Sequence, residues 1–206
     1  CMDHLGYESS NADNDVWIRK AVNDKGNEYY EFMLLYVDDC LSISHDADAA
    51  LNEIGKYFSL KGPIEFPKIY LGGKVGKITL PNGVKAYTFS ATQYVREAVK
   101  NVEEYMKAKG YTFTSKKIGV PLPTNYSPEF DDSAELDAEE ASYYQSLIGI
   151  LRWIVELGRI DINFEASTMS SHTALPRIGH LRKLFHIFGY LKHHSNARLV
   201  FDPTYP

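Results

Sequence analysis

Two adjacent acidic residues, Asp38 and Asp39, interrupt an otherwise apolar stretch that runs from Phe32 to Ile43. Asp favours turns, so this pattern predicts two short strands that meet in a hairpin with both carboxylates at its tip. Carboxylate oxygens suit Mg²⁺ or Mn²⁺, and a hairpin tip holds them on a rigid element. Two such ions roughly 4 Å apart can catalyse in-line phosphoryl transfer. An Asp-Asp pair taken alone, however, is more often an ordinary surface turn.

The residues that follow this hairpin predict an α+β fold. From Asp46 the apolar residues recur at helical spacing and would share one face of a helix: Ala50, Leu51, Ile54, Tyr57 and Phe58. A strand with a close backbone approach at Gly72-Gly73 is expected over residues 69–75. Asn82-Gly83 is typical of the turn that joins two further strands.

Four helices are expected in the rest of the chain. Ser90–Gln93 and Ser142–Gln145 each match a capping box that would open a helix, and Gly110 would close the first one. A third helix is expected over 159–171. The last begins at Pro176, with five inward-facing residues: Leu181, Leu184, Phe185, Phe188 and Leu191. The sequence therefore predicts an α+β region over 1–120, an acidic proline-containing linker over 121–141, and a helical region over 142–206.

The charge is distributed unevenly along the chain. The net charge is -5, yet residues 51–126 hold twelve Lys and Arg against five Asp and Glu. Such a basic region can contact nucleic-acid phosphates, although the alternative is an ordinary solvated surface. The candidate phosphate-binding residues are Lys56, Lys61, Lys68, Lys74, Lys77, Lys85, Arg96 and Lys100.

Other patterns restrict the class of protein. Two cysteines, Cys1 and Cys40, provide no disulfide framework, which favours a reducing compartment. No apolar run approaches the roughly 20 residues of a membrane-spanning helix, so no membrane is expected among the partners. Five histidines lie between His172 and His194, but their spacings match no common zinc site.

Several short motifs together resemble a known family. They occur in the order and spacing of copia-type LTR-retrotransposon reverse transcriptases: Leu34-Leu35-Tyr36-Val37-Asp38-Asp39, Tyr70-Leu71-Gly72, Gln93-Tyr94-Val95, Tyr144–Gly149 and Arg159-Ile160-Asp161-Ile162. Each motif is weak alone, and the ordered set spans nearly the whole chain. In many relatives Pro stands where this chain has Ile160, so a smoother helix is expected there.

The resemblance implies a fold and a set of roles. Residues 1–120 would be part of a polymerase palm with a primer-grip hairpin and a thumb helix, and 142–206 would be a thumb–connection region leading toward a ribonuclease H domain. Asp38 and Asp39 would be the catalytic, metal-binding residues for Mg²⁺ or Mn²⁺. Five residues would lie near the nucleotide or primer: Tyr36, Val37, Leu71, Gly72 and Gly73.

The same resemblance implies the partners. They are an RNA template, a DNA primer, deoxynucleotide triphosphates and the rest of the retrotransposon polyprotein. The implied location is a cytoplasmic virus-like particle whose product gains access to the nucleus.

One departure from the family pattern matters for activity. The family uses a further Asp on an earlier palm strand and a fingers region, and neither is recognisable here. We therefore expect a fragment of a longer chain that is inactive in isolation. Two alternatives stay open: a non-catalytic retrotransposon remnant that binds nucleic acid or only folds, and an unrelated α+β protein.

The basic region generates a prediction about salt. If its side chains neutralise several phosphates, affinity for a primer–template duplex should fall steeply as salt rises, because bound counterions are released. Titration at several salt concentrations measures the slope. Binding that is absent at low salt, or that does not change with salt, would contradict the nucleic-acid interpretation.

Overall fold

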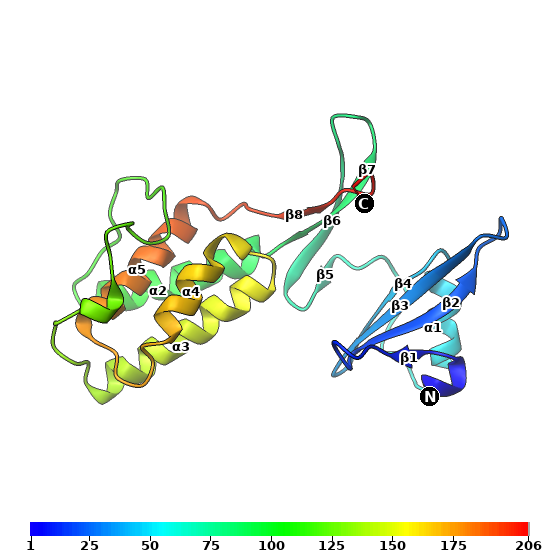
Figure 1. The fold of residues 1–206 in the computed structure, drawn as a ribbon, viewed down its shortest axis with the longest axis horizontal. Helices are drawn as coiled ribbons and strands as arrows, with labels where there is room; N and C mark the ends of the chain where they lie inside the picture. The colour runs from blue at the N-terminus through cyan, green and yellow to red at the C-terminus, as the bar shows by residue number, and fades with distance from the viewer. Residues whose placement is uncertain (206) are drawn as a thin grey trace. The chain divides into compact units, whose positions relative to one another are not determined.

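The computed structural model describes residues 1–205, which form two compact units, Cys1–Pro67 and the chain from Lys68 onward. Each unit contains one four-stranded antiparallel sheet, and five α-helices are divided between them (Figure 1). The predicted α+β class is therefore confirmed. The units separate after residue 67, whereas composition places the regional boundaries at 120 and 141.

The first unit is built on a sheet in the order β1-β2-β3-β4. Its strands are β1 (Glu8–Ser9), β2 (Val16–Val22), β3 (Glu28–Tyr36) and β4 (Asp39–Ile43), preceded by the 3₁₀ turn η1 (Asp3–Leu5). Side chains alternate between the two faces of a strand, and Met33 faces the core beside Ala50 and Ile54 of helix α1 (Ala47–Gly55). Asp46 caps this helix by accepting a hydrogen bond from the Ala49 N–H at 2.9 Å.

The apolar stripe predicted for this helix is partly wrong. Ala50 and Ile54 are buried on it, but the helix ends at Gly55, a poor helix former. Tyr57 and Phe58 therefore lie beyond the helix, and their exposed fractions are 55% and 59%.

The buried carboxylate of Glu31 links three segments of the first unit. Glu31 on β3 accepts hydrogen bonds from Tyr7 at 2.9 Å and Ser44 at 2.8 Å, and it pairs with Arg19 on β2. Arg19 also reaches Glu53 on α1 at 2.8 Å. Burial would raise the pKa of Glu31, but the hydrogen bonds from Ser44, Arg19 and Tyr7 outweigh it and lower the pKa.

The second unit begins with a sheet in the order β5-β6-β7-β8. Its strands are β5 (Ile69–Tyr70), β6 (Gly73–Thr79), β7 (Lys85–Ser90) and β8 (Leu199–Phe201). The hairpin predicted at Asn82-Gly83 is confirmed, with Gly83 at φ 81°. The single strand predicted over 69–75 is wrong, because Leu71 and Gly72 make a turn that separates β5 from β6.

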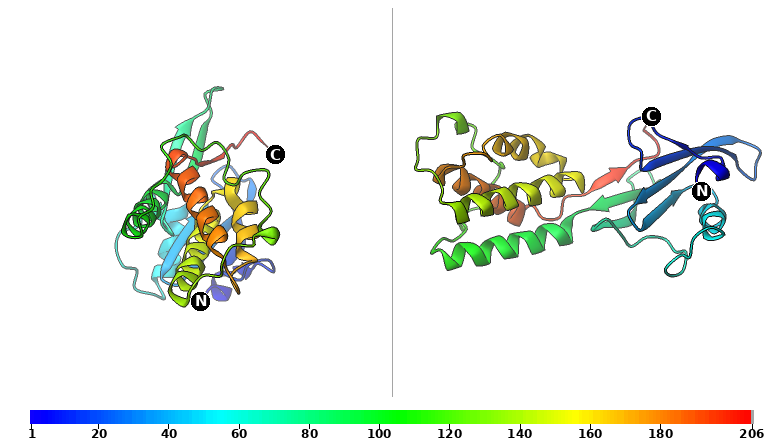
Figure 2. Two further views of the ribbon diagram at one scale, coloured as in Figure 1. Left: turned by 90° about the vertical axis from the view of Figure 1, so that its left-hand side faces the viewer. Right: turned by 90° about the horizontal axis from the view of Figure 1, so that it is seen from below.

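Four helices supply the core of this unit: α2 (Thr92–Ala108), α3 (Ala138–Glu156), α4 (Asn163–Ser170) and α5 (Ile178–His193) (Figure 2). The inward-facing stripe predicted for the last helix is confirmed, since all five of its residues are buried. Gly110 closes α2 as predicted, with φ 79° and a Tyr111 N–H to Met106 carbonyl hydrogen bond of 2.7 Å. Within residues 1–205 no helix is long and apolar enough to cross a membrane.

Both predicted capping boxes are wrong. At α2 the N-cap position is Ala91, which has no side chain able to cap. Helix α3 begins at Ala138, four residues before Ser142, because Asp137 accepts a hydrogen bond from the Glu140 N–H at 2.8 Å. The smooth helix expected around Ile160 is also wrong, since a separate 3₁₀ turn, η3 (Ile160–Ile162), precedes α4.

The stretch predicted as a linker, 121–141, is packed against the helices. Leu122, Tyr126 and Leu136 contact the helical core, and Pro128 is buried in the turn η2 (Pro128–Phe130). The prolines and acidic residues of this segment favour a linker. Its apolar residues nevertheless pack against the helical core and hold the segment in place.

The Glu31 network generates a prediction about stability. Glu31→Gln removes the charge that pairs with Arg19, so the first unit should lose about 1–3 kcal/mol of unfolding free energy at neutral pH. Because the folded-state pKa of Glu31 is lowered, its contribution is present above the ordinary carboxyl pKa and is lost as pH falls below about 4. Stability of the variant should therefore depend less on pH in this acidic range.

Urea unfolding followed through Trp17, in a Trp153→Phe background, measures this loss. Glu28→Gln, an exposed carboxyl on the same strand, is the matched control. Equal unfolding midpoints for the two variants would contradict the role assigned to Glu31.

Candidate functional site

The two candidate catalytic residues lie at the tip of the β3–β4 hairpin. Tyr36 pairs with Asp39, so only Val37 and Asp38 form the turn between the strands. Both Asp residues are exposed, as the apolar–Asp-Asp–apolar pattern predicts. Because directly opposed residues point to the same face of a sheet, the Asp39 carboxylate and the Tyr36 ring share one face. The turn therefore presents two carboxylates and one aromatic ring to solvent.

Val37 holds an unusual backbone conformation in this turn. Its φ is 52° and its side chain is 92% exposed, so no packing of the side chain compensates for the conformation. A β-branched residue at positive φ is a genuine outlier, although two-residue hairpins require positive φ at their first central position. Such strain is concentrated at functional sites, and here it lies next to Asp38 and Asp39.

The carboxylates of Asp38 and Asp39 are exposed to solvent. The Lys61 ammonium lies 3.7 Å from a carboxylate oxygen of Asp38, with side-chain exposures of 90% and 81%. An ion pair this exposed contributes little to stability. It does place a cation against the carboxylate, as expected where two adjacent acids repel each other.

The donors present fit part of a magnesium site. The two carboxylates are hard oxygen ligands, but within residues 1–205 no group of three or more His, Cys, Asp or Glu side chains is arranged to hold a metal ion. The neighbouring Cys40 is not a suitable ligand. Burial raises the pKa of its thiol, which hydrogen-bonds to the sulfur of Met33 at 3.3 Å.

Of the five residues expected near the nucleotide or primer, Tyr36 and Val37 lie in the first unit, and Leu71, Gly72 and Gly73 lie in the second. Leu71 and Gly72 form the β5–β6 turn with φ values of 49° and 85°. Gly73 lies directly beneath the Phe89 ring, which occupies the space that a Cβ would need. The close backbone approach predicted at Gly72-Gly73 is replaced by a close approach of an aromatic side chain, and only at Gly73.

The predicted basic residues are divided between the two units. Lys56 and Lys61 lie in the first unit, and the other six lie in the second. Lys74 and Lys77 point to opposite faces of β6, because their positions differ by an odd number. Arg96 is already engaged with Asn196 at 2.7 Å, and Lys100 lies 3.9 Å from Glu104.

A buried polar cluster in the helical core has a role that motif matching did not indicate. Arg159 is 1% exposed and makes two hydrogen bonds of 2.8 Å to Asp161, which also accepts one from Tyr190 at 3.1 Å. Burial would raise the pKa of Asp161, but hydrogen bonding and charge from Arg159 lower it. These contacts join the η3 turn to α5, so the Arg-Ile-Asp-Ile motif fixes this turn against the last helix.

The histidines near the C-terminus bind backbone atoms. Three of their ring nitrogens lie within hydrogen-bond distance of carbonyls in the 118–128 segment: His180 to Pro128 at 3.0 Å, His186 to Val120 at 3.2 Å and His194 to Ile118 at 2.9 Å. His180 also accepts the Arg177 N–H at 3.1 Å, so both of its nitrogens are occupied. The sequence alone could not indicate this role, because it depends on contacts across more than 50 residues.

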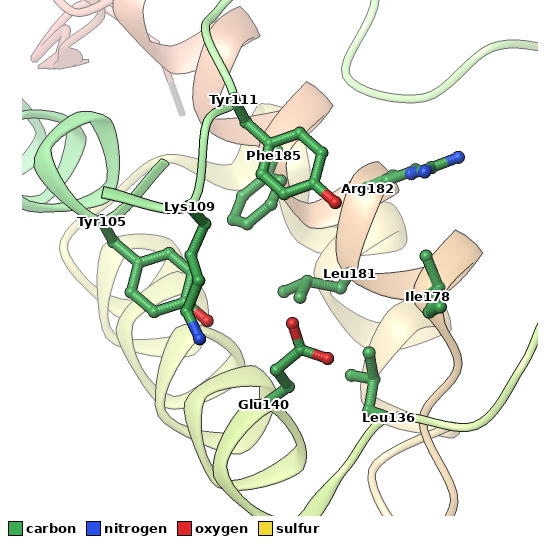
Figure 3. Close-up of a pocket in the computed structure, with 9 residues that line it drawn as sticks. All are labelled: Tyr105, Lys109, Tyr111, Leu136, Glu140, Ile178, Leu181, Arg182 and Phe185. Atoms are coloured by element: carbon green, nitrogen blue, oxygen red, sulfur yellow. The ribbon is translucent and has the colours of Figure 1, made fainter. Parts of the chain in front are cut away.

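A small cavity of about 50 Å³ lies between α2, α3 and α5 (Figure 3). The Glu140 carboxylate points toward Leu181 in this space, and the side chain of Arg182 points away. The Tyr105 hydroxyl is buried without a hydrogen-bond partner among the described residues. None of the candidate site residues lines this cavity.

Comparisons with protein-family models, curated proteins and solved structures give no match to this chain. The resemblance to copia-type reverse transcriptases therefore stays a prediction. A function for this chain has to be argued from the β3–β4 hairpin and the exposed carboxylates at its tip.

The strained turn generates a prediction about stability. Val37→Gly removes a conformational cost of about 1–2 kcal/mol and adds a glycine entropy cost of about 0.5–1 kcal/mol. The first unit should therefore become more stable by roughly 0.5–1 kcal/mol. Urea unfolding followed through Trp17 measures the change.

Val22→Gly provides the matched control, because Val22 is an exposed valine on β2 without positive φ. This control should lower stability. A Val37→Gly variant that is destabilised to the same degree would show that Val37 is not strained.

Proposed function

We propose that this chain is part of an RNA-directed DNA polymerase of a copia-type retrotransposon. The observation that carries the proposal is the pair Asp38 and Asp39 at the exposed tip of a hairpin whose two strands are hydrogen-bonded throughout. The motifs along the chain that resemble this family give it further support. The partners proposed are an RNA template, a DNA primer and deoxynucleotide triphosphates.

The role of each hairpin residue follows from its chemistry. Asp38 and Asp39 would hold Mg²⁺ or Mn²⁺, which when bound supplies charge stabilisation for phosphoryl transfer. Tyr36 shares a face with Asp39 and would contact the primer end or the incoming nucleotide. Val37 is 92% exposed, so a substrate could approach this turn closely.

The isolated chain is proposed to be inactive. Two-metal catalysis needs carboxylates from more than one strand, and the described residues bring only the hairpin pair together. Magnesium gives up water reluctantly, so two carboxylates on an open turn should hold it weakly. The same observation favours a second candidate, a non-catalytic remnant that binds nucleic acid without polymerising it.

Nucleotide incorporation on a primed RNA template tests the proposal. We expect no incorporation by residues 1–206 and incorporation by a longer polymerase chain that also carries a palm strand with a further Asp. In that longer chain Asp38→Asn should lower incorporation by at least about a hundredfold, because it removes several kcal/mol of transition-state stabilisation.

Asp24→Asn is the matched control, since Asp24 is an exposed turn residue joining β2 to β3 of the same sheet. It should leave incorporation unchanged. Incorporation by residues 1–206 that disappears in Asp38→Asn would show that the site is already complete. A longer chain that binds template without incorporating nucleotides would favour the non-catalytic remnant.

A further inference from the structure

We propose that the face of the β1–β4 sheet opposite helix α1 carries an apolar strip that docks a basic amphipathic helix of a partner protein. The apolar strip is made of eight side chains on β2, β3 and β4: Val16, Ile18, Val22, Tyr30, Phe32, Leu34, Leu41 and Ile43. This inference goes beyond the proposed function and does not depend on it, because it rests on the packing and the charge of the first unit.

The strand register places these side chains on one face of the sheet. Leu34 on β3 is directly opposite Val16 on β2 and Leu41 on β4. The row beside it has the same pairing through Phe32. Directly opposed residues share a face, and so do alternate residues along a strand, which adds the other members. The apolar strip therefore crosses three neighbouring strands.

The other face of this sheet is already covered. Helix α1 lies on that side (Figure 2), and Met33, Trp17 and Leu35 pack with it into the core of the first unit. None of the eight residues of the apolar strip belongs to this core. Within residues 1–67 no α-helix other than α1 is present. The first unit therefore covers its sheet with a helix on one face only.

The composition of β3 indicates burial on both faces. A sheet with one face in water usually alternates apolar and polar residues, whereas residues 32–36 of β3 are all apolar or aromatic. Yet Val22, Tyr30 and Ile43 on the apolar strip are 63%, 56% and 54% exposed. Exposed apolar residues that are gathered on one surface in this way mark an interaction site.

The charges around the apolar strip favour a basic partner. Residues 1–67 hold thirteen Asp and Glu against five Lys and Arg. Among the strand residues of this face, three acids stand against one base: Glu8, Glu28 and Asp39 against Lys20. Positive charges on a partner would complement these acids, whereas a second copy of this acidic unit would meet like charge.

The dimensions of the apolar strip suit one helix. The seven residues of β2 span about 23 Å, which a helix of about 15 residues matches. Strands lie about 4.8 Å apart, so three of them are about 10 Å wide, which is the diameter of one helix with its side chains. A helix with apolar residues at i, i+3, i+4 and i+7 can therefore cover the strip, with basic residues on its flanks facing the acids.

Binding of fluorescein-labelled peptides to residues 1–206, measured by anisotropy, tests this inference. The probe is a Leu–Lys peptide of about 18 residues with Leu at helical spacing. Its controls are a Leu–Glu helix of the same pattern and a Leu–Lys peptide of the same composition without helical spacing. The Leu–Lys helix should bind at least about tenfold more tightly than either control, because it alone combines an apolar stripe with positive charge.

Substitutions in the chain locate the binding surface. Ile43→Thr and Val22→Thr change exposed residues at opposite edges of the apolar strip and keep a β-branched side chain. Each should weaken binding of the Leu–Lys helix by roughly tenfold, because a buried methyl group is replaced by a hydroxyl. Ile43→Val stays apolar and should bind nearly as tightly as the unmodified chain. Val200→Thr, at an exposed valine of the other sheet, is the matched control and should have no effect.

Three results would overturn the inference. Binding that is unchanged in both threonine variants, or weakened equally by Val200→Thr, would show that the apolar strip is not the docking surface. Equal binding of the Leu–Glu helix would show that the partner need not be basic. Sedimentation of the chain alone should show no self-association that Ile43→Thr abolishes. Dimers that this substitution dissociates would show that a second copy covers the strip.

Discussion

The two-residue turn between β3 and β4 is the constraint on which the candidate site depends. Because Val37 and Asp38 alone join the strands, Tyr36 is held opposite Asp39, and the pairing continues from Leu35 and Cys40 to Phe32 and Ile43. A slip of one residue would either turn Met33 out of the core or carry Asp39 toward it. The positions of the carboxylates are therefore set by the same register that buries Met33, and the positive φ of Val37 is the cost of so short a turn.

The two units are stabilised in different ways, and this affects what each can do. The first has a small core around Met33 and depends on the charged network of Glu31, Arg19 and Glu53. The second has an extensive helical core and a second hairpin with a positive-φ residue, Leu71. The first unit is sensitive to acid, since Glu31 must stay ionised for its pairing.

Local patterns in the sequence predicted several local features, but the capping boxes were wrong and the distant contacts were missed. The hairpin at Asp38-Asp39, the Asn82-Gly83 turn and the inward face of α5 depend on residues near each other in the chain, and all three are present. The pairing of β8 with β7 joins residues more than 100 positions apart, and no spacing rule indicates it. Residues 121–141 look like a linker by composition, but contacts with His180 and the helical core fix part of them. Spacing predicted one strand over 69–75 because leucine rarely adopts positive φ, whereas the primer-grip hairpin that the family resemblance implies matches the turn at Leu71 and Gly72.

The central claim is that the Asp38-Asp39 turn binds a divalent cation. Paramagnetic broadening of backbone amide signals by Mn²⁺ in the isolated chain measures this directly, since broadening depends on distance from the bound ion and needs no catalysis. Weak binding by two carboxylates should broaden signals from residues around Val37 at the highest Mn²⁺ concentrations, and Asp38→Asn should abolish that effect. Broadening that is centred on another part of the chain, or that persists unchanged in Asp38→Asn, would contradict the account.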